Sequence, residues 1–212
     1  MLNWKVIFAA AAMLIGVATS ASASVITYSL TSDFCTGTCG TAPFGTVTVS
    51  SVSSTEVSVD LTLAANEVFA KTGAGAALLF DLTGNPSITV SNLTPMFTAT
   101  QTASGGNIHA DGTGHWQYSI DCTGCGNGTS PPNSSGPLDF DITVASGITP
   151  SSFIKNDGRL FFATDIRGAN GNTGDVGAPT GVTPPPAVPE PATLMILGAG
   201  LVALGLARRK GA

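Results

Sequence analysis

The sequence predicts an all-β protein: an antiparallel β-sandwich or jelly-roll-like ectodomain, with one apolar segment near each end of the chain. Three observations lead to this prediction. Apolar and polar residues alternate through several short segments, turn-forming residues separate these segments, and no helical pattern longer than one turn precedes residue 192. Alternation with a period of two is typical of half-buried strands, and many short strands between turns are typical of sandwiches.

The clearest alternation runs through Gly45–Val52 and Glu56–Leu63. In the second segment valine and leucine fall on one face, and serine, aspartate and threonine on the other. Ser53-Ser54-Thr55 between them predicts a hairpin, and Asn156-Asp157-Gly158 predicts a second hairpin turn. Further strands are expected at Val25–Leu30, Ala77–Leu82, Ser87–Ser91, Met96–Thr100, His115–Ile120, Leu138–Val144 and Leu160–Ile166.

The N-terminal segment predicts a signal peptide over residues 1–23. Lys5 supplies a positive charge, Val6–Ala18 is an uncharged apolar run, and Ala21 and Ala23 form a small-x-small cleavage site. Signal peptidase is therefore an expected partner, and the mature chain is expected to begin at Ser24. An N-terminal membrane anchor is the alternative.

The C-terminal segment predicts a transmembrane helix over residues 192–207, followed by a basic membrane stop at Arg208, Arg209 and Lys210. A 16-residue helix is roughly 24 Å long, while the hydrocarbon core is roughly 30 Å thick. Basic side chains that reach toward the interface can close that gap, and the positive-inside rule puts them in the cytoplasm. A buried core helix is the alternative for so short a run.

Pro189-Glu190-Pro191, the apolar run and the basic stop together resemble the PEP-CTERM sorting signal of Gram-negative bacteria. The resemblance implies an exosortase as partner, which would cut the chain near Pro189, Glu190 and Pro191. It also implies an exported protein: an inner-membrane-anchored precursor that is then released to the cell surface or the medium. The resemblance covers about the last 25 residues and carries no information about the rest of the chain.

Four regions follow from these patterns: a signal peptide (1–23), a β-sandwich ectodomain (24–178), a Pro-rich linker (179–188) and the sorting tail (189–212). Between Ser24 and Val188 the chain has 12 acidic and four basic residues, hence a net charge of −8. Nucleic-acid binding needs stripes of lysine and arginine, so no nucleic-acid partner is expected. The acidic charge favours solubility, and it could also attract divalent cations.

Four cysteines form two local pairs, Cys35 with Cys39 and Cys122 with Cys125. Disulfides are expected because an exported protein meets an oxidising environment. Four cysteines allow three pairings; the local one is favoured because each pair lies in a short Gly/Thr turn. A redox C-x-x-C site and a Cys₄ zinc site are the alternatives, although no helix follows the second pair.

No nucleophile-elbow, zinc-protease or phosphate-loop motif is present, so no catalytic residue, metal ligand set or cofactor is assigned. His109, Asp111 and His115 cluster locally, and surface histidines in a loop are the favoured interpretation. Gly168–Asp175, together with Asp165, could bind Ca²⁺ through oxygen ligands, but turn chemistry explains the segment equally well.

The favoured function is a non-enzymatic, cell-surface or extracellular matrix-associated protein. The alternative is a surface protein resembling a carbohydrate-binding module, with extracellular polysaccharide as partner. Trp116 and Tyr118 are the candidate sugar contacts, expected on one face of one strand; Tyr28 is the other aromatic residue able to both stack and hydrogen-bond. Burial of these rings in the core is the favoured interpretation. A secreted hydrolase ranks third.

Overall fold

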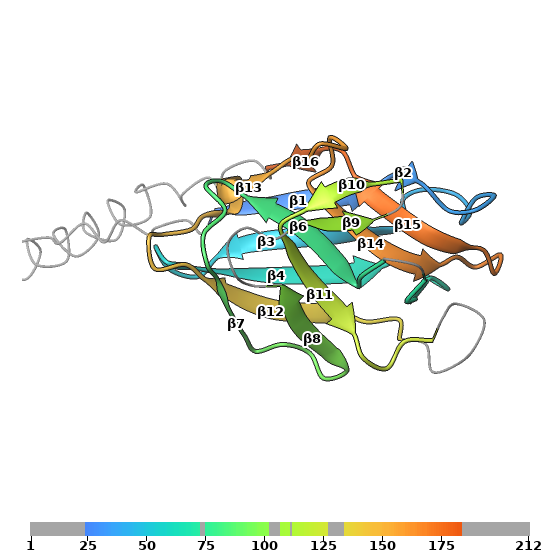
Figure 1. Ribbon diagram of the computed structural model, residues 1–212, viewed down its shortest axis with the longest axis horizontal. Coiled ribbons are helices and arrows are strands. Elements are labelled where there is room, and N and C mark those ends of the chain that lie inside the picture. The colour runs from blue at the N-terminus through green and yellow to red at the C-terminus, as the bar shows by residue number, and fades with distance from the viewer. Residues whose placement is uncertain (1–23, 73–74, 102–106, 111, 127–133, 184–212) are drawn as a thin grey trace, which may run out of the picture.

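The computed structural model describes residues 24–72, 75–101, 107–110, 112–126 and 134–183. They form two sheets packed face to face, in which every strand pairing is antiparallel (Figure 1). The only helical element among these residues is a single 3₁₀ turn, η1 (Pro150–Ser152). The predicted all-β, antiparallel fold class is confirmed.

The first sheet has six strands in the order β16-β1-β3-β4-β12-β7. Their bounds are β16 (Gly181–Val182), β1 (Val25–Leu30), β3 (Gly45–Ser51), β4 (Glu56–Leu63), β12 (Leu138–Thr143) and β7 (Thr89–Ser91). β3 and β4 form the predicted hairpin around residues 53–55. Burial in β12 alternates strictly, as it does along most of β4, because one face of this sheet packs on the core and the other meets solvent.

The second sheet follows the order β2-β15-β14-β6-β11-β8, with β13 also paired to β6 and β5 to β14. Its strands are β2 (Ser32–Asp33), β15 (Thr173–Ala178), β14 (Phe162–Arg167), β6 (Leu78–Leu82), β11 (Tyr118–Cys122), β8 (Phe97–Gln101), β13 (Phe153–Ile154) and β5 (Val68–Phe69). A separate hairpin of β9 (Ile108–Ala110) and β10 (Gly114–Trp116) lies against its outer face.

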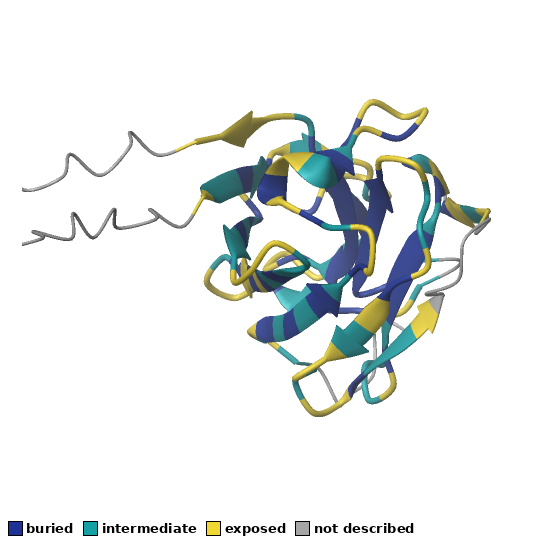
Figure 2. Ribbon diagram, turned by 90° about the vertical axis from the view of Figure 1, so that its left-hand side faces the viewer, coloured by how far each residue is buried: buried dark blue, intermediate teal, exposed yellow. Residues whose placement is uncertain are grey.

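The main core lies between the sheets, where Figure 2 shows the buried segments in dark blue. Phe80 of β6 is fully buried there, and its ring packs against four other rings: Tyr118, Phe140, Phe153 and Phe162. A second, smaller core lies on the outer face of the second sheet. There Leu79 and Ala163 are covered by Trp116 and Ala110 of the outer hairpin, with Ala76 and Leu160 beside them. All five residues of β6 are therefore buried.

Several element boundaries differ from those predicted. The expected strand His115–Ile120 is interrupted at Gln117, whose backbone N–H donates to the side-chain carboxylate of Asp81 in β6. The segment Asn156-Asp157-Gly158 forms a turn, closed by a hydrogen bond from Asn156 N to Leu160 O. The turn does not form the predicted hairpin. β13 and β14, the strands before and after the turn, both run antiparallel to β6. They are therefore parallel to each other, whereas the two strands of a hairpin are antiparallel.

The sandwich also extends further toward the C-terminus than predicted. Gly181 and Val182 pair with Tyr28 and Thr27, so the ordered sheet continues past residue 178 into the segment assigned to the linker. The predicted signal peptide and the predicted membrane helix over residues 192–207 lie outside the described residues. Within the part of the chain that the structure describes, no helix has the length and apolar character needed to cross a membrane.

Candidate functional site

The chain enters and leaves the sandwich at the same end. β16 runs antiparallel to β1, with Val182 opposite Thr27, so the residue after β16 lies beside the first residues of β1. The loop between β2 and β3 lies at the opposite end of β1 (Figure 1). The predicted signal peptide and the predicted sorting tail are thus attached at the same end of the sandwich. The predicted cleavage site, sorting residues and basic stop themselves lie outside the described residues.

Both predicted disulfides form. Cys35 is joined to Cys39 and Cys122 to Cys125, with Cα–Cα distances of 5.6 and 5.4 Å. The pairing is the local one. In this state of the protein no thiolate is available to hold zinc, because all four sulfurs are in disulfides. The redox alternative stays a hypothesis, because the oxidised form of a redox C-x-x-C pair is also a disulfide.

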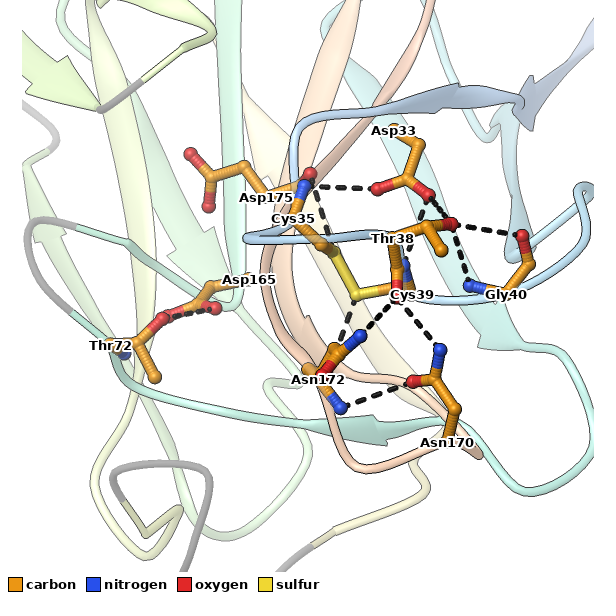
Figure 3. The surroundings of a disulfide bond; sticks show 10 residues. All are labelled: Asp33, Cys35, Thr38, Cys39, Gly40, Thr72, Asp165, Asn170, Asn172 and Asp175. Atoms are coloured by element: carbon orange, nitrogen blue, oxygen red, sulfur yellow. Dashed lines mark hydrogen bonds between the residues drawn. A yellow bond between two sulfur atoms is a disulfide. The ribbon is translucent and has the colours of Figure 1, made fainter.

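Asp33 organises the first disulfide loop (Figure 3). Its carboxylate accepts hydrogen bonds from Cys35 N at 2.9 Å, Cys39 N at 3.0 Å and Thr38 Oγ1 at 2.6 Å. Burial raises the pKa of this carboxyl, but the three hydrogen bonds outweigh burial and hold the pKa below its ordinary value. Asp33, Cys35 and Cys39 also bring three metal-type ligand atoms within 4.8 Å of one another. With both sulfurs joined, this group is a disulfide turn capped by a carboxylate.

The segment proposed for Ca²⁺ packs against this loop. Asn170 and Asn172 each donate a side-chain hydrogen bond of 2.8 Å to Thr38 O (Figure 3). Gly168 approaches so closely that a Cβ there would lie 2.1 Å from Cys39 O, which explains the glycine. The amides therefore fasten two loops together, and residues 173–175 belong to β15. Among the described residues, no cluster of three or more His, Cys, Asp or Glu ligand atoms includes Asp165 or Asp175.

Asp165, the other residue named for Ca²⁺, is fully buried on the outer face of the second sheet, opposite Asp175 of β15. It accepts hydrogen bonds from Thr72 N and Thr72 Oγ1, and burial raises its pKa. Asp175 accepts one from Thr113 Oγ1 at 3.2 Å, and that hydroxyl in turn accepts one from Trp116 Nε1 at 3.2 Å. These carboxylates anchor a loop and the outer hairpin to the sheet.

Trp116 and Tyr118 do not form a surface platform. Their exposed fractions are 1 % and 0 %, and they point into different cores: Trp116 into the outer cluster, Tyr118 into the main one. Tyr118 stacks on Phe80 and donates its hydroxyl hydrogen to Pro86 O, and burial raises its pKa to about 12. The predicted shared face is wrong because the chain breaks strand geometry at Gln117. Burial, the favoured interpretation, is confirmed.

His109 and His115 lie directly opposite each other on the outer hairpin, with ring centroids 5.0 Å apart. Both are exposed. Asp157 holds His115 twice: Oδ1 accepts from the His115 backbone N–H at 2.8 Å, and Oδ2 lies 2.8 Å from Nδ1. These two hydrogen bonds lower the pKa of the Asp157 carboxyl. The ring is thereby fixed with Nδ1 toward Asp157 and Nε2 directed elsewhere.

A polar pocket opens beside this pair, with a volume of about 240 Å³. It is lined by Asp81, Asn107, His115, Trp116, Gln117 and Asp157. Asp81 is 7 % exposed; burial, and to a smaller extent the charge of Asp157, raises its pKa to about 6 despite the hydrogen bond from Gln117 N. Sequence reasoning missed Asp81, although one signal was available: an acidic residue in the otherwise apolar run Leu78–Leu82.

A second hollow of about 450 Å³ lies where the chain leaves the sandwich. Tyr28, Phe153 and Phe161 form its aromatic part, and Lys155 Nζ lies 5.3 Å from the centre of the Phe161 ring. The Tyr28 hydroxyl donates to Pro150 O, and the residue is only 2 % exposed, so its ring supports the wall and is not free to stack on a ligand. Thr180 and Gly181, the residues leading to the tail, line the same hollow.

Residues 187–210 match the family model described as the PEP-CTERM protein-sorting motif. The chain carries a PEP-CTERM sorting motif. This confirms the resemblance seen in Pro189, Glu190 and Pro191 and in the basic residues that end the tail. No curated protein and no solved structure matches the chain.

The PEP-CTERM motif begins four residues after Thr183, the last described residue of the folded part. The motif marks an exported protein that is sorted by an exosortase and held in the membrane before processing. The last strand, β16, ends before the motif begins. A cut at Pro189–Pro191 would therefore leave every described strand on the released side.

Proposed function

We propose that the protein is a non-enzymatic component of the cell surface or extracellular matrix, delivered there by exosortase processing of its PEP-CTERM tail. The observation that carries the proposal is the sorting motif at residues 187–210, placed directly after the β-sandwich. The properties of the β-sandwich agree with an extracellular location, because it is acidic and both of its cysteine pairs form disulfides.

The non-enzymatic part of the proposal is supported by how its acidic groups are used. Asp33 caps a disulfide loop, and Asp165 and Asp175 hold a loop and a hairpin to the sheet. These carboxylates serve the fold, which is the ordinary role of hydrogen-bonded buried polar groups.

Deletion of the gene, with complementation by two chains, tests this proposal. One chain is the natural sequence; the other lacks residues 189–212. We expect the deletion strain to lose flocculation and retained surface polysaccharide, and only the natural chain to restore them. Unchanged flocculation and polysaccharide retention in the deletion strain would remove the matrix role. Enzymatic release of sugar or peptide fragments by the purified protein would contradict the non-enzymatic assignment.

Carbohydrate binding is the second candidate function, and the polar pocket beside His115 favours it. The pocket combines carboxylates, amides and an imidazole in a hollow of about 240 Å³. Such a set of donors and acceptors suits a ligand that carries several hydroxyl groups. The candidate contact Tyr118 lies in the main core, whereas Trp116 is one of the residues that line this pocket.

A further inference from the structure

The polar pocket is held rigid by hydrogen bonds that leave other atoms of the same side chains available. Asp81 Oδ1 accepts from Gln117 N at 2.6 Å, while Gln117 Oε1 accepts from Leu82 N at 3.0 Å. Each side chain is thus anchored to a backbone N–H group: Asp81 to that of Gln117, and Gln117 to that of Leu82. Groups held in this way bind a ligand at a lower entropic cost than groups that must first be ordered.

The unused atoms point to the kind of ligand. Among the described residues, no hydrogen bond engages Asp81 Oδ2, Gln117 Nε2 or the Asn107 side chain. Asp81 is more than nine-tenths buried as a residue, but Oδ2 is not one of the fully buried atoms without a partner, so this oxygen is accessible from the pocket that Asp81 lines. His115 adds Nε2, because Asp157 occupies Nδ1. The pocket therefore offers a carboxylate acceptor, amide groups able to donate or accept, and an imidazole nitrogen.

Charge excludes one class of ligand. Asp81 and Asp157 both line the pocket, and Asp157 already opposes ionisation of Asp81. A phosphate, a sulfate or a uronate would add a third negative charge at short range, which is unfavourable in a partly buried site. A neutral or cationic ligand remains.

Spacing disfavours a bare cation. Ligands of one metal ion lie close together, and among the described residues the only three metal-type ligand atoms within 4.8 Å of one another are those of Asp33, Cys35 and Cys39. In the pocket, His115 and Asp157 are in contact, but the Asp81 carboxylate does not join them in such a close group. Hydroxyl groups around a pyranose ring are also set apart from one another, and each can both donate and accept a hydrogen bond.

We propose that the pocket lined by Asp81, Asn107, His115 and Gln117 binds one neutral hexopyranose unit of a glycan. Asp81 Oδ2 accepts hydrogen bonds from sugar hydroxyls, the amides of Gln117 and Asn107 donate to them, and the buried Trp116 lines the pocket. The site deepens the carbohydrate-binding candidate function, and it does not depend on how the cell sorts the chain.

The natural chain provides its own reporter. Its two tryptophans are Trp4, in the predicted signal peptide, and Trp116, at the pocket. The full chain carrying Trp4→Phe, held in a zwitterionic detergent that contains no sugar, therefore reports on Trp116 alone. Methyl glucopyranoside, methyl galactopyranoside and methyl mannopyranoside are titrated separately, with glycerol as the control for non-specific solvent effects. Because the assay uses the purified precursor, failed export in cells would leave its result unaffected.

We expect at least one of the three sugars to change Trp116 fluorescence saturably, with a dissociation constant of roughly 0.1–10 mM, as befits a small ligand with few buried contacts. Asp81→Asn should weaken this binding by about tenfold or more, since it keeps the oxygen that accepts from Gln117 N but loses the carboxylate charge. Asn107→Ala, a change at an exposed residue, should weaken it by about threefold. Asp141→Asn on the opposite sheet should leave it unchanged.

Three results would overturn the proposal. One is the lack of a saturable change with all three sugars at concentrations up to about 50 mM, well above the expected dissociation constant. Another is a change that persists undiminished in both Asp81→Asn and Asn107→Ala. The third is saturation by CaCl₂ in the absence of sugar, abolished by Asp81→Asn, which would make the pocket a cation site instead.

Discussion

Asp60 of β4 and Asp139 of β12 lie directly opposite each other in the first sheet. Burial, and next the neighbouring Asp60 carboxyl, raises the pKa of Asp139 to about 6. Like charges placed opposite each other across two strands destabilise a sheet. Asp139 therefore keeps its proton to a higher pH in the folded chain than in the unfolded chain, where the ordinary value is 3.8.

A first prediction is that the protein loses stability as the pH rises through this range. The folded state binds more protons than the unfolded state between pH 3.8 and about 6, so the free energy of unfolding falls across this interval and stays lower above it. Asp139→Asn should remove the charge and raise stability at pH 7.5 by about 1 kcal/mol, a value discounted for screening by solvent. Urea unfolding at pH 4.5 and 7.5 measures both effects.

Asp60→Asn provides the matched control for this pair. Either single variant removes the same repulsion, so the double variant should gain no more than the better single one, and the cycle should show clear non-additivity. Equal stability of the natural chain at the two pH values, together with strict additivity of the two variants, would contradict the coupling.

A second prediction concerns Asn156, which joins the outer hairpin to the second sheet. Its buried amide donates to Thr113 O at 2.6 Å and His115 O at 3.2 Å, and accepts from Leu160 N at 3.0 Å. Asn156→Ala leaves these backbone groups without partners and should cost about 2–4 kcal/mol in denaturant unfolding. Asn170→Ala is the control and should cost well under about 1 kcal/mol, because Asn170 is exposed and Asn172 donates to the same Thr38 oxygen. An equal loss of stability in both variants would show that the three hydrogen bonds of Asn156 contribute no more to stability than the contacts of Asn170.

A third prediction concerns the two disulfides. Each joins cysteines only three or four positions apart, and the chain-entropy relation gives about 2 kcal/mol for so short a loop. Cys35→Ala with Cys39→Ala should therefore lower the stability by about this much, and Cys122→Ala with Cys125→Ala should do likewise. Intact mass before and after reduction should differ by four hydrogens. A mass difference of only two hydrogens would contradict the presence of two disulfides. Unchanged stability in either double variant would show that the disulfide removed there does not stabilise the fold.

A fourth prediction concerns the sorting motif. Replacing Pro189, Glu190 and Pro191 by alanine should leave an uncut precursor in the membrane fraction, because alanine allows the extended segment to continue the predicted membrane helix and removes the charge. Replacing Pro184, Pro185 and Pro186 by alanine removes equally many prolines upstream and should leave processing intact. Immunoblots of membrane and medium fractions, with intact mass of any released form, distinguish the two. Equal release of both variants would show that the enzyme does not read these residues.

Alternation of residue types carried most of the fold prediction. β1 and β4 have the predicted bounds, because a clean period of two fixes which residues face the core. β15 was missed because Thr173–Ala178 contains two glycines and an aspartate, a composition typical of loops. Its strand form comes from tertiary contacts: Asp175 accepts a hydrogen bond from Thr113, and β15 pairs with β14 along the whole length of β15. Local patterns contain neither of these contacts.

The candidate sites also differ in how far they could be predicted from local sequence patterns. The sorting motif and the local disulfides are contiguous in sequence and could be read directly. The polar pocket draws on β6, the outer hairpin and the turn at Asp157, segments up to 76 positions apart in the chain. Sequence reasoning noticed His115 and Trp116 individually but had no means of bringing Asp81 and Asp157 beside them, because strand order sets that proximity.

The pairing of β16 with β1 also determines how mechanical load enters the molecule while the tail is anchored. Tension on the tail acts first on β16, which holds β1 through two residue pairs, whereas β1 holds β3 through six. Because β16 is an edge strand joined directly to the tether, such a pull peels its pairs apart in succession and leaves the deeper pairs intact. Under tension from the tail, the two-residue strand β16 should therefore separate from β1 before the core of the sandwich is disturbed.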